Sequence, residues 1–212
     1  MRINFGRFSA AYGLTPAGQQ PGAAWRDERF LAAKGYAEFA ARFAGCTFNN
    51  GLYRVHDATS GPRAYAMIVH AFPELAGRIC PFAFDWYGRQ LAVDAQRSRD
   101  GEPLLLLACA TTGAAYQVPH PFAAFHDEML VDTPDEAVAR KFFLAWASAN
   151  RSSLPLKPDQ CVGPRLPLSL GGSDDIDSLE LSDLEVHWLL HGQTWRGTRR
   201  LVGARITKTT IV

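Results

Sequence analysis

Apolar residues change their spacing twice along this chain, and these changes constrain the fold more than any single motif does. Up to Leu75 they recur at helical intervals, from Ile79 to Val118 they alternate or form short runs, and after Phe122 the helical spacing returns. Alternation with a period of two is typical of strands, whereas intervals of three and four residues indicate helices. Strands flanked by groups of helices predict an α+β fold with a largely antiparallel sheet flanked by helices, and a helical N-terminal part.

Local signals place individual elements within this order. Helices are expected over residues 5–12, 25–43, 62–72, 122–130, 135–149 and from 182 onward, and strands over 52–56, 82–84, 91–93, 104–109, 115–118, near 161–164 and over 202–206. Thr133 and Ser182 are expected as N-caps, since a glutamate follows each of them three positions later. The organisation predicts a helical part over residues 1–75 and an α+β part over residues 76–212, which can also pack as one compact unit.

The charge balance narrows the classes of partner. With 22 Lys and Arg against 21 Asp and Glu, the 212-residue chain has a net charge of +1, which argues against a general nucleic-acid binder. The first residues lack the apolar core of a secretory signal, and the longest apolar run, Leu104–Ala110, is too short for a membrane span. The cysteines lie far apart among apolar neighbours, which favours reduced core residues. We therefore expect a cytoplasmic protein without a membrane or nucleic-acid partner.

The most unusual polar segment lies between Asp174 and Glu185. Six acidic residues occur there without a Lys or Arg between them. Asp183 and Glu185 are assigned to the start of the following helix, whose dipole favours acidic residues. The predicted partner-binding residues are the other four: Asp174, Asp175, Asp177 and Glu180. Clustered carboxylates speed the encounter with a basic partner. The alternative is a solvated loop that binds nothing.

Histidines supply the candidate catalytic groups. His187 and His191 lie four residues apart on a predicted helix and could share a metal, but the Glu of a zinc-peptidase motif is missing and no third ligand is indicated. A polar helix face is the favoured interpretation. His126 precedes Asp127 and Glu128, yet adjacent helical positions point apart. No nucleophile elbow, phosphate loop or dinucleotide motif occurs. We expect no catalytic residue, metal or cofactor, and a small metal-dependent or His/carboxylate hydrolase is the alternative.

Five segments, in this order, resemble a known family: FNNGLYRVH (48–56), PFAFDWYGRQLAVD (81–94), PFAAFHDEML (121–130), CVGPRLPLSLGG (161–172) and LELSDLEVHWLLHGQ (179–193). Together they resemble the bacterial immunity proteins paired with type VI secretion DNase effectors. That family combines a GAD-like N-terminal part with a C-terminal domain formerly of unknown function. The likeness covers residues 36–195 and is strongest in DWYGRQ and SDLEVHW.

The resemblance implies a GAD-like part over residues 1–75 and an immunity-like domain over residues 76–212. It also implies a non-catalytic protein that binds a cognate toxin, a nuclease, in the cytoplasm of the producing cell and neutralises it. The resemblance does not identify the contact residues or the oligomeric state. A regulatory scaffold protein is a further alternative.

Overall fold

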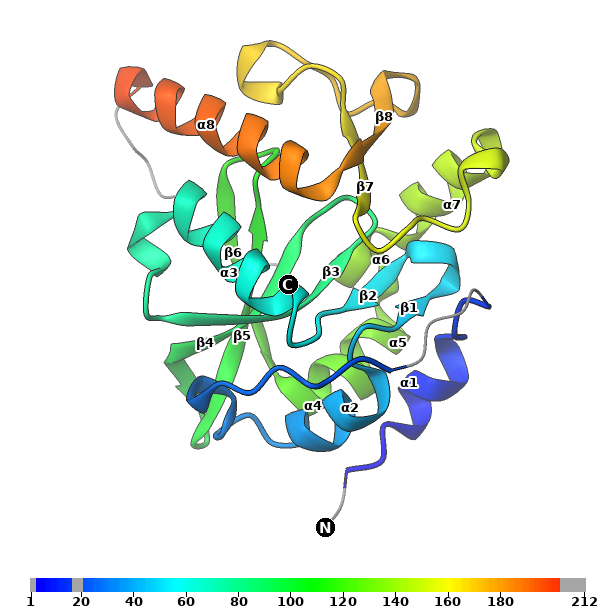
Figure 1. The fold of residues 1–212 in the computed structure, drawn as a ribbon, viewed down its shortest axis with the longest axis vertical. Coiled ribbons are helices and arrows are strands. Elements are labelled where there is room, and N and C mark those ends of the chain that lie inside the picture. The colour runs from blue at the N-terminus through cyan, green and yellow to red at the C-terminus, as the bar shows by residue number, and fades with distance from the viewer. Residues whose placement is uncertain (1–2, 17–20, 203–212) are drawn as a thin grey trace.

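A six-stranded antiparallel sheet forms the centre of the computed structural model, which describes residues 3–16 and 21–202 (Figure 1). Its strands follow one another in chain order, and each pairs with its neighbour in sequence: β1 (Thr47–Phe48), β2 (Tyr53–Val55), β3 (Ile79–Asp85), β4 (Gln90–Arg99), β5 (Glu102–Cys109) and β6 (Ala114–Pro121). A second, two-stranded sheet pairs β7 (Gln160–Pro164) with β8 (Leu179–Asp183). The expected α+β fold with an antiparallel sheet is confirmed.

Helices cover both faces of the large sheet. They are α1 (Gly6–Ala11), α2 (Tyr36–Phe43), α3 (Ser60–Ala71), α4 (Phe122–Ala124), a π-helical turn (Phe125–Met129), α5 (Leu130–Asp132), α6 (Pro134–Val138), α7 (Arg140–Ala149) and α8 (Leu184–Val202). Short 3-10 turns are η1 (Glu28–Phe30), η2 (Asn49–Gly51), η3 (Pro73–Leu75), η5 (Arg151–Ser153), η6 (Leu168–Leu170) and η7 (Ile176–Ser178). No helix in the described ranges combines the length and apolarity needed to span a bilayer.

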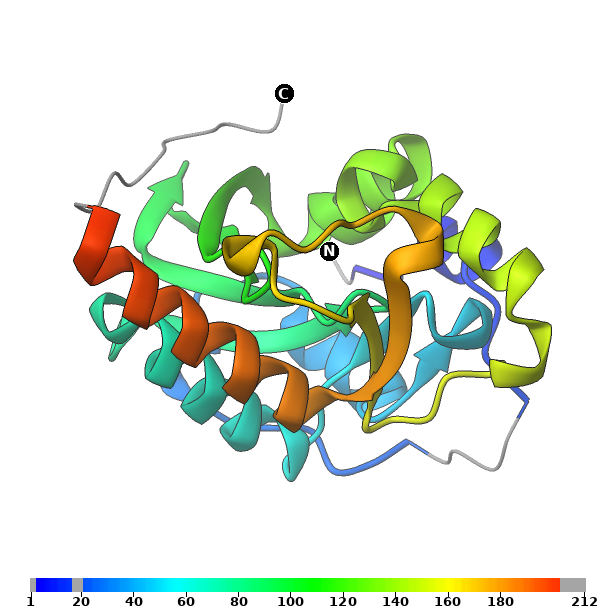
Figure 2. The ribbon, with the colours of Figure 1, turned by 90° about the horizontal axis from the view of Figure 1, so that it is seen from above.

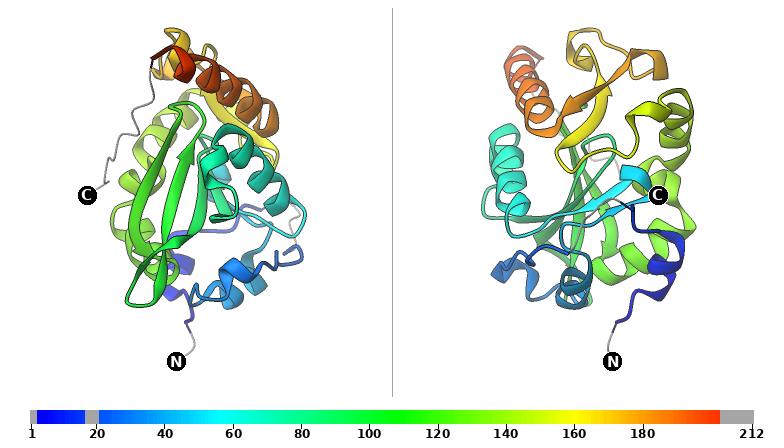
Figure 3. Two further views of the ribbon diagram at one scale, coloured as in Figure 1. Left: turned by 90° about the vertical axis from the view of Figure 1, so that its left-hand side faces the viewer. Right: turned by 45° about the vertical axis from the view of Figure 1, so that its right-hand side comes forward.

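The sheet separates two apolar cores. Because strand side chains alternate between faces, Leu105 and Leu107 enter the larger core, whereas Leu106 enters the smaller one. Helices α1, α2 and α4–α7 contribute to the larger core, which is rich in phenylalanine. Helices α3 and α8 lie together over the opposite face and form the smaller core, as the two views in Figure 3 show. Both sides of the sheet are therefore closed by helices.

Two expected helices are interrupted. Residues 25–43 form η1 and α2 instead of one helix, because Gly35 adopts a φ of 85° just before α2 begins. Residues 134–149 are divided into α6 and α7 by Ala139, whose φ is 51°. Thr133 does precede α6, but its hydroxyl donates to the Met129 carbonyl and makes no capping hydrogen bond.

The large sheet and core continue across Leu75, where the boundary between two parts is expected. Strands β1 and β2 come from the first 75 residues and pair with β3, and the larger core contains residues from both sides. The division into 1–75 and 76–212 stays a prediction about independent folding. Of the expected strand over residues 202–206, Val202 lies in α8 and the rest lies outside the described residues. The four cysteines are buried and free.

Candidate partner-binding region

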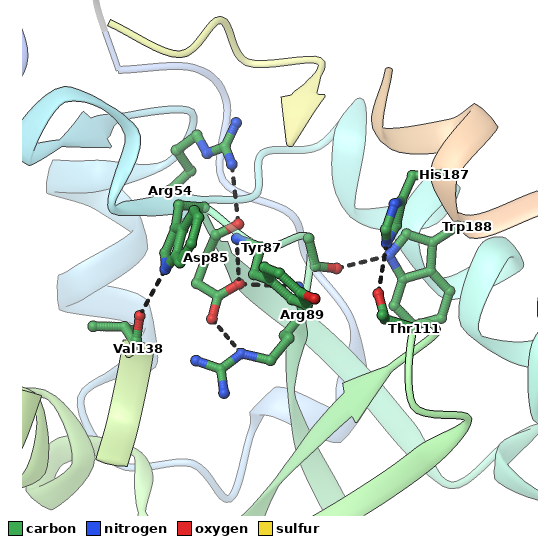
Figure 4. Close-up of polar contacts among 10 residues, drawn as sticks. Arg54, Asp85, Tyr87, Arg89, Thr111, Val138, His187 and Trp188 are labelled. Carbon is green, nitrogen blue, oxygen red and sulfur yellow. Dashed lines mark hydrogen bonds and ion pairs between the residues drawn. The ribbon is translucent and has the colours of Figure 1, made fainter. Parts of the chain in front are cut away.

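The turn between β3 and β4, Asp85-Trp86-Tyr87-Gly88-Arg89, is held by one buried carboxylate. Asp85 accepts hydrogen bonds from the backbone N–H groups of Tyr87 and Arg89, each at 3.0 Å, and from Arg89 Nε at 2.6 Å (Figure 4). Burial raises the pKa of the Asp85 carboxyl, and the guanidinium of Arg89 opposes this rise. Gly88 supplies a φ of 76°, in the left-handed region that favours glycine. The conformation of the turn is therefore held by hydrogen bonds among its own residues.

Arg54 joins this turn to the segment that leads into β7. Its guanidinium donates to the Asp85 carbonyl at 3.0 Å and to the carbonyls of Lys157 and Gln160. It also lies over the Phe84 ring, 4.2 Å from the centroid. Arg54 is 1% exposed, and burial lowers its pKa to about 10. The buried cation is thus used to satisfy three backbone carbonyls, a structural role.

Two tryptophans link other elements to the same turn by hydrogen bonds. Trp86 Nε1 donates to the Val138 carbonyl of α6 at 3.1 Å, and Trp188 Nε1, from α8, donates to the Gly88 carbonyl at 2.7 Å. The N–H of Val162 in β7 donates to the Trp86 carbonyl at 2.8 Å. Helix α6, strand β7 and helix α8 are therefore all hydrogen-bonded to this one turn. These bonds fix their positions relative to the large sheet.

His187 and His191 lie on the inner side of α8, so the expected polar helix face is wrong. Both side chains are buried, and their ring centroids are 4.2 Å apart. His187 Nε2 is 3.1 Å from Thr111 Oγ1 of the β5–β6 turn. Burial lowers the pKa of His187 to about 3 and also lowers that of His191, which favours neutral imidazoles. Within the described part of the chain, no group of three or more His, Cys, Asp or Glu residues is arranged to hold a metal.

His126 belongs to the larger core. Its Nδ1–H donates to the Phe122 carbonyl at 2.8 Å, and its Nε2 accepts from the Tyr53 hydroxyl at 2.9 Å. The side chain is 0% exposed, and burial lowers its pKa to about 3. Asp127 points elsewhere and accepts from the backbone N–H of Phe8. As the sequence predicts, the adjacent histidine and carboxylate do not converge on a common point.

The four predicted partner-binding residues are all exposed, but they do not share one loop. Asp174 and Asp175 precede η7, Asp177 lies within it, and Glu180 lies on β8, a strand that the sequence analysis missed. Asp175 accepts from Ser173 Oγ at 2.7 Å. Glu180 is 3.8 Å from Arg165 Nε, so the run is partly offset by a cation distant in the sequence. The structure shows these side chains open to solvent.

The start of α8 uses the other two acidic residues of the run. Asp183, and not the expected Ser182, caps the helix, since Asp183 Oδ1 accepts from the N–H of Val186 at 2.9 Å. Glu185 is 3.7 Å from Arg63 on α3. These assignments agree with the expectation that Asp183 and Glu185 serve the helix start.

Sequence reasoning missed the outer face of α8. Val186, Leu189 and Leu190 are exposed by 48%, 48% and 55%, and they share one face because they lie three and four residues apart. His187 and Trp188 occupy the opposite, buried face. The sequence does contain a signal for this face. The apolar residues of the segment fall on both sides of a helix, which is unusual for a helix on a protein surface.

Comparison with known proteins finds a family model that is similar to part of this region. Residues 135–194 match the model of the family described as T6SS immunity protein Tdi1, C-terminal. None of the curated proteins matches the chain significantly. The fold is similar to that in the crystal structure of Atu4351 from Agrobacterium tumefaciens, with a TM-score of 0.60 and 14% sequence identity, over 90% of this chain and 89% of that chain. At this identity the likeness shows a shared fold alone.

The matched segment is therefore similar to the C-terminal domain of a type VI secretion immunity family, in agreement with the sequence resemblance. It begins in α6 and ends in α8, and it includes β7, β8 and the exposed acidic residues. No comparison identifies residues 1–75 as a GAD-like part, so this assignment stays a prediction.

Proposed function

We propose that this protein is an immunity protein that binds a cognate toxin, a nuclease, in the cytoplasm of the producing cell and neutralises it by covering its active surface. The observation that carries the proposal is the match of residues 135–194 to the T6SS immunity family. The protein acts in this proposal by binding, without chemistry of its own. In support, the three histidines considered as catalytic, His126, His187 and His191, are buried and have lowered pKa values.

Electrostatics support a nuclease as the toxin. A nuclease must attract phosphate groups, so its active surface carries a positive field. The exposed carboxylates of Asp174, Asp175, Asp177 and Glu180 lie within the family-matched segment and can compete for such a surface. Among the described residues, no hydrogen bond or ion pair links Asp174 or Asp177 to another side chain. Their charges are therefore available to a partner.

Co-expression tests the immunity function. The gene adjacent to that of this protein is placed under an inducible promoter in a bacterial host, with or without this chain. We expect the adjacent gene product to kill the host alone, to be tolerated when this chain is present, and to be retained by the tagged chain on a column. A harmless product, or a toxic one that this chain neither neutralises nor retains, would contradict the proposal.

Charge reversal tests the acidic surface separately. The triple variant Asp174→Lys, Asp175→Lys and Asp177→Lys should slow association with the toxin by about tenfold or more at low salt and weaken the salt dependence of the association rate. A matched control reverses three exposed acidic residues elsewhere: Glu38, Glu128 and Glu136. Equal association rates for both triple variants would remove the acidic surface from the interface and leave the immunity function standing.

A further inference from the structure

The outer face of α8 is apolar, and none of the residues that the structure describes, 3–16 and 21–202, covers it. Val186, Leu189 and Leu190 each expose about half of their side chains there. The inner face already packs against the sheet through Trp188 and His187, so the exposed face is not needed for the smaller core. Contiguous apolar side chains on a surface helix are typical of a site that binds another protein. The helix therefore has two contact faces, one of which is used within the chain.

Carboxylates lie near α8 in two places. At the beginning of α8, Asp57, Asp159, Asp183 and Glu185 line an open pocket of about 370 Å³. Elsewhere, η6 contacts α8 and leads into the segment that carries Asp174, Asp175 and Asp177. Seen from above, that segment lies beside α8 on the same side of the molecule (Figure 2). An apolar centre with a charged rim is the usual anatomy of a protein interface.

The charges indicate which kind of partner fits. Arg63 lines the pocket and is 3.7 Å from Glu185. No other Lys or Arg of the described part of the chain lines the pocket to balance the carboxylates of Asp57, Asp159 and Asp183. Two copies of this chain joined symmetrically through α8 would bring like-charged rims together, which is unfavourable. A partner with lysines or arginines around an apolar surface would instead pair with both groups of carboxylates.

We propose that Val186, Leu189 and Leu190 form the apolar centre of the toxin interface, and that the toxin presents there an apolar surface bordered by basic side chains. This inference rests on the proposed immunity function and locates it on one helix face. The acidic residues steer the encounter, and the leucines supply the contact that persists in the complex. Substitution of these apolar residues should therefore change the dissociation rate of the toxin complex more than its association rate.

Two substitutions at one position separate apolar contact from charge. Leu190→Glu and Leu190→Lys both remove the apolar contact, but only the lysine is repelled by a basic rim. With the purified product of the adjacent toxin gene as probe, we expect Leu190→Glu to raise Kd about tenfold and Leu190→Lys about a hundredfold or more. Leu144→Lys is the matched control, because Leu144 is 53% exposed on α7, within the family-matched segment. It should leave Kd unchanged.

Each outcome is decisive once thermal unfolding has shown that the variants are folded. If the wild-type chain protects the host and both Leu190 variants bind as tightly as Leu144→Lys, the α8 interface is wrong and the immunity function stands. If Leu190→Glu binds more weakly than Leu190→Lys, the basic partner surface is wrong. If the purified wild-type chain is a dimer that Leu190→Lys converts to a monomer, the face joins copies of this chain. If the wild-type chain gives no protection, the immunity function and this inference both fail.

Discussion

Acid should destabilise this protein at a pH where most carboxylates are still ionised, because three histidines are buried as neutral imidazoles. Burial lowers the pKa of His56 to about 4 and those of His126 and His187 to about 3. These side chains are 3%, 0% and 3% exposed, so solvent does not screen them. In the unfolded chain, each histidine has a pKa of about 6.5. The unfolded chain therefore binds protons more tightly than the folded protein does.

The sign and size follow from this difference. Their contribution to stability is fully present above about pH 6.5 and is lost as the pH falls toward the folded pKa, by about 1.4 kcal/mol per pH unit for each histidine. At about pH 5 the three histidines together remove about 6 kcal/mol, which is comparable with the whole unfolding free energy of a typical domain. The lowered pKa of His191 acts in the same direction. The raised pKa of Asp85 acts in the opposite direction, but it is one group against several.

Urea unfolding followed by tryptophan fluorescence measures the effect. The unfolding free energy should be constant above about pH 7 and fall by about 4 kcal/mol per pH unit below about pH 6. His187→Gln should reduce that slope by about 1.4 kcal/mol per pH unit, because one titrating group is removed. His70→Gln is the control, since His70 is exposed at the end of α3. An unfolding free energy that stays constant from about pH 7 to pH 5 would refute the reasoning.

Two further predictions concern the attachment and the start of α8, and thermal unfolding checks both. Gly163→Ala should destabilise the protein by about 1–3 kcal/mol, because the added Cβ lies 2.4 Å from His187 Cε1; Gly197→Ala, on α8 with open space around it, should not destabilise it. Asp183→Ala should cost about 1 kcal/mol, because the helix loses its N-cap; Ser182→Ala should cost less, and equal losses would contradict the capping assignment.

The antiparallel hairpins could be predicted because their apolar patterns are local. Phe82 and Phe84 precede the turn and Leu91 and Val93 follow it, and the alternation alone places them on β3 and β4. The break between α6 and α7 could not be predicted in this way. Ala139 adopts a left-handed conformation there with a φ of 51°, although alanine is a strong helix former. Packing of Val138 and Phe143 in the larger core fixes both flanking segments.

The candidate site was predicted in part, for a physical reason. Charge is visible in a sequence, so the exposed acids Asp174, Asp175 and Asp177 could be identified. The side of a helix that faces the core is decided by tertiary packing. The polar side chain of His187 is buried beneath α8, whereas the apolar side chain of Leu190 is exposed. This is the reverse of the usual preference. Only the structure shows this reversal.

The chain-order arrangement of β1–β6 has a consequence for synthesis of the protein. Each strand pairs with its sequence neighbour, so the large sheet can form from local contacts as the chain leaves the ribosome. Helix α8 differs, because the hydrogen bond from Trp188 to Gly88 spans 100 residues. The smaller core stays open until residues 184–202 have been made and docked. The two apolar cores should therefore be completed in sequence, and the smaller one should close abruptly, in a single step, with the docking of one helix.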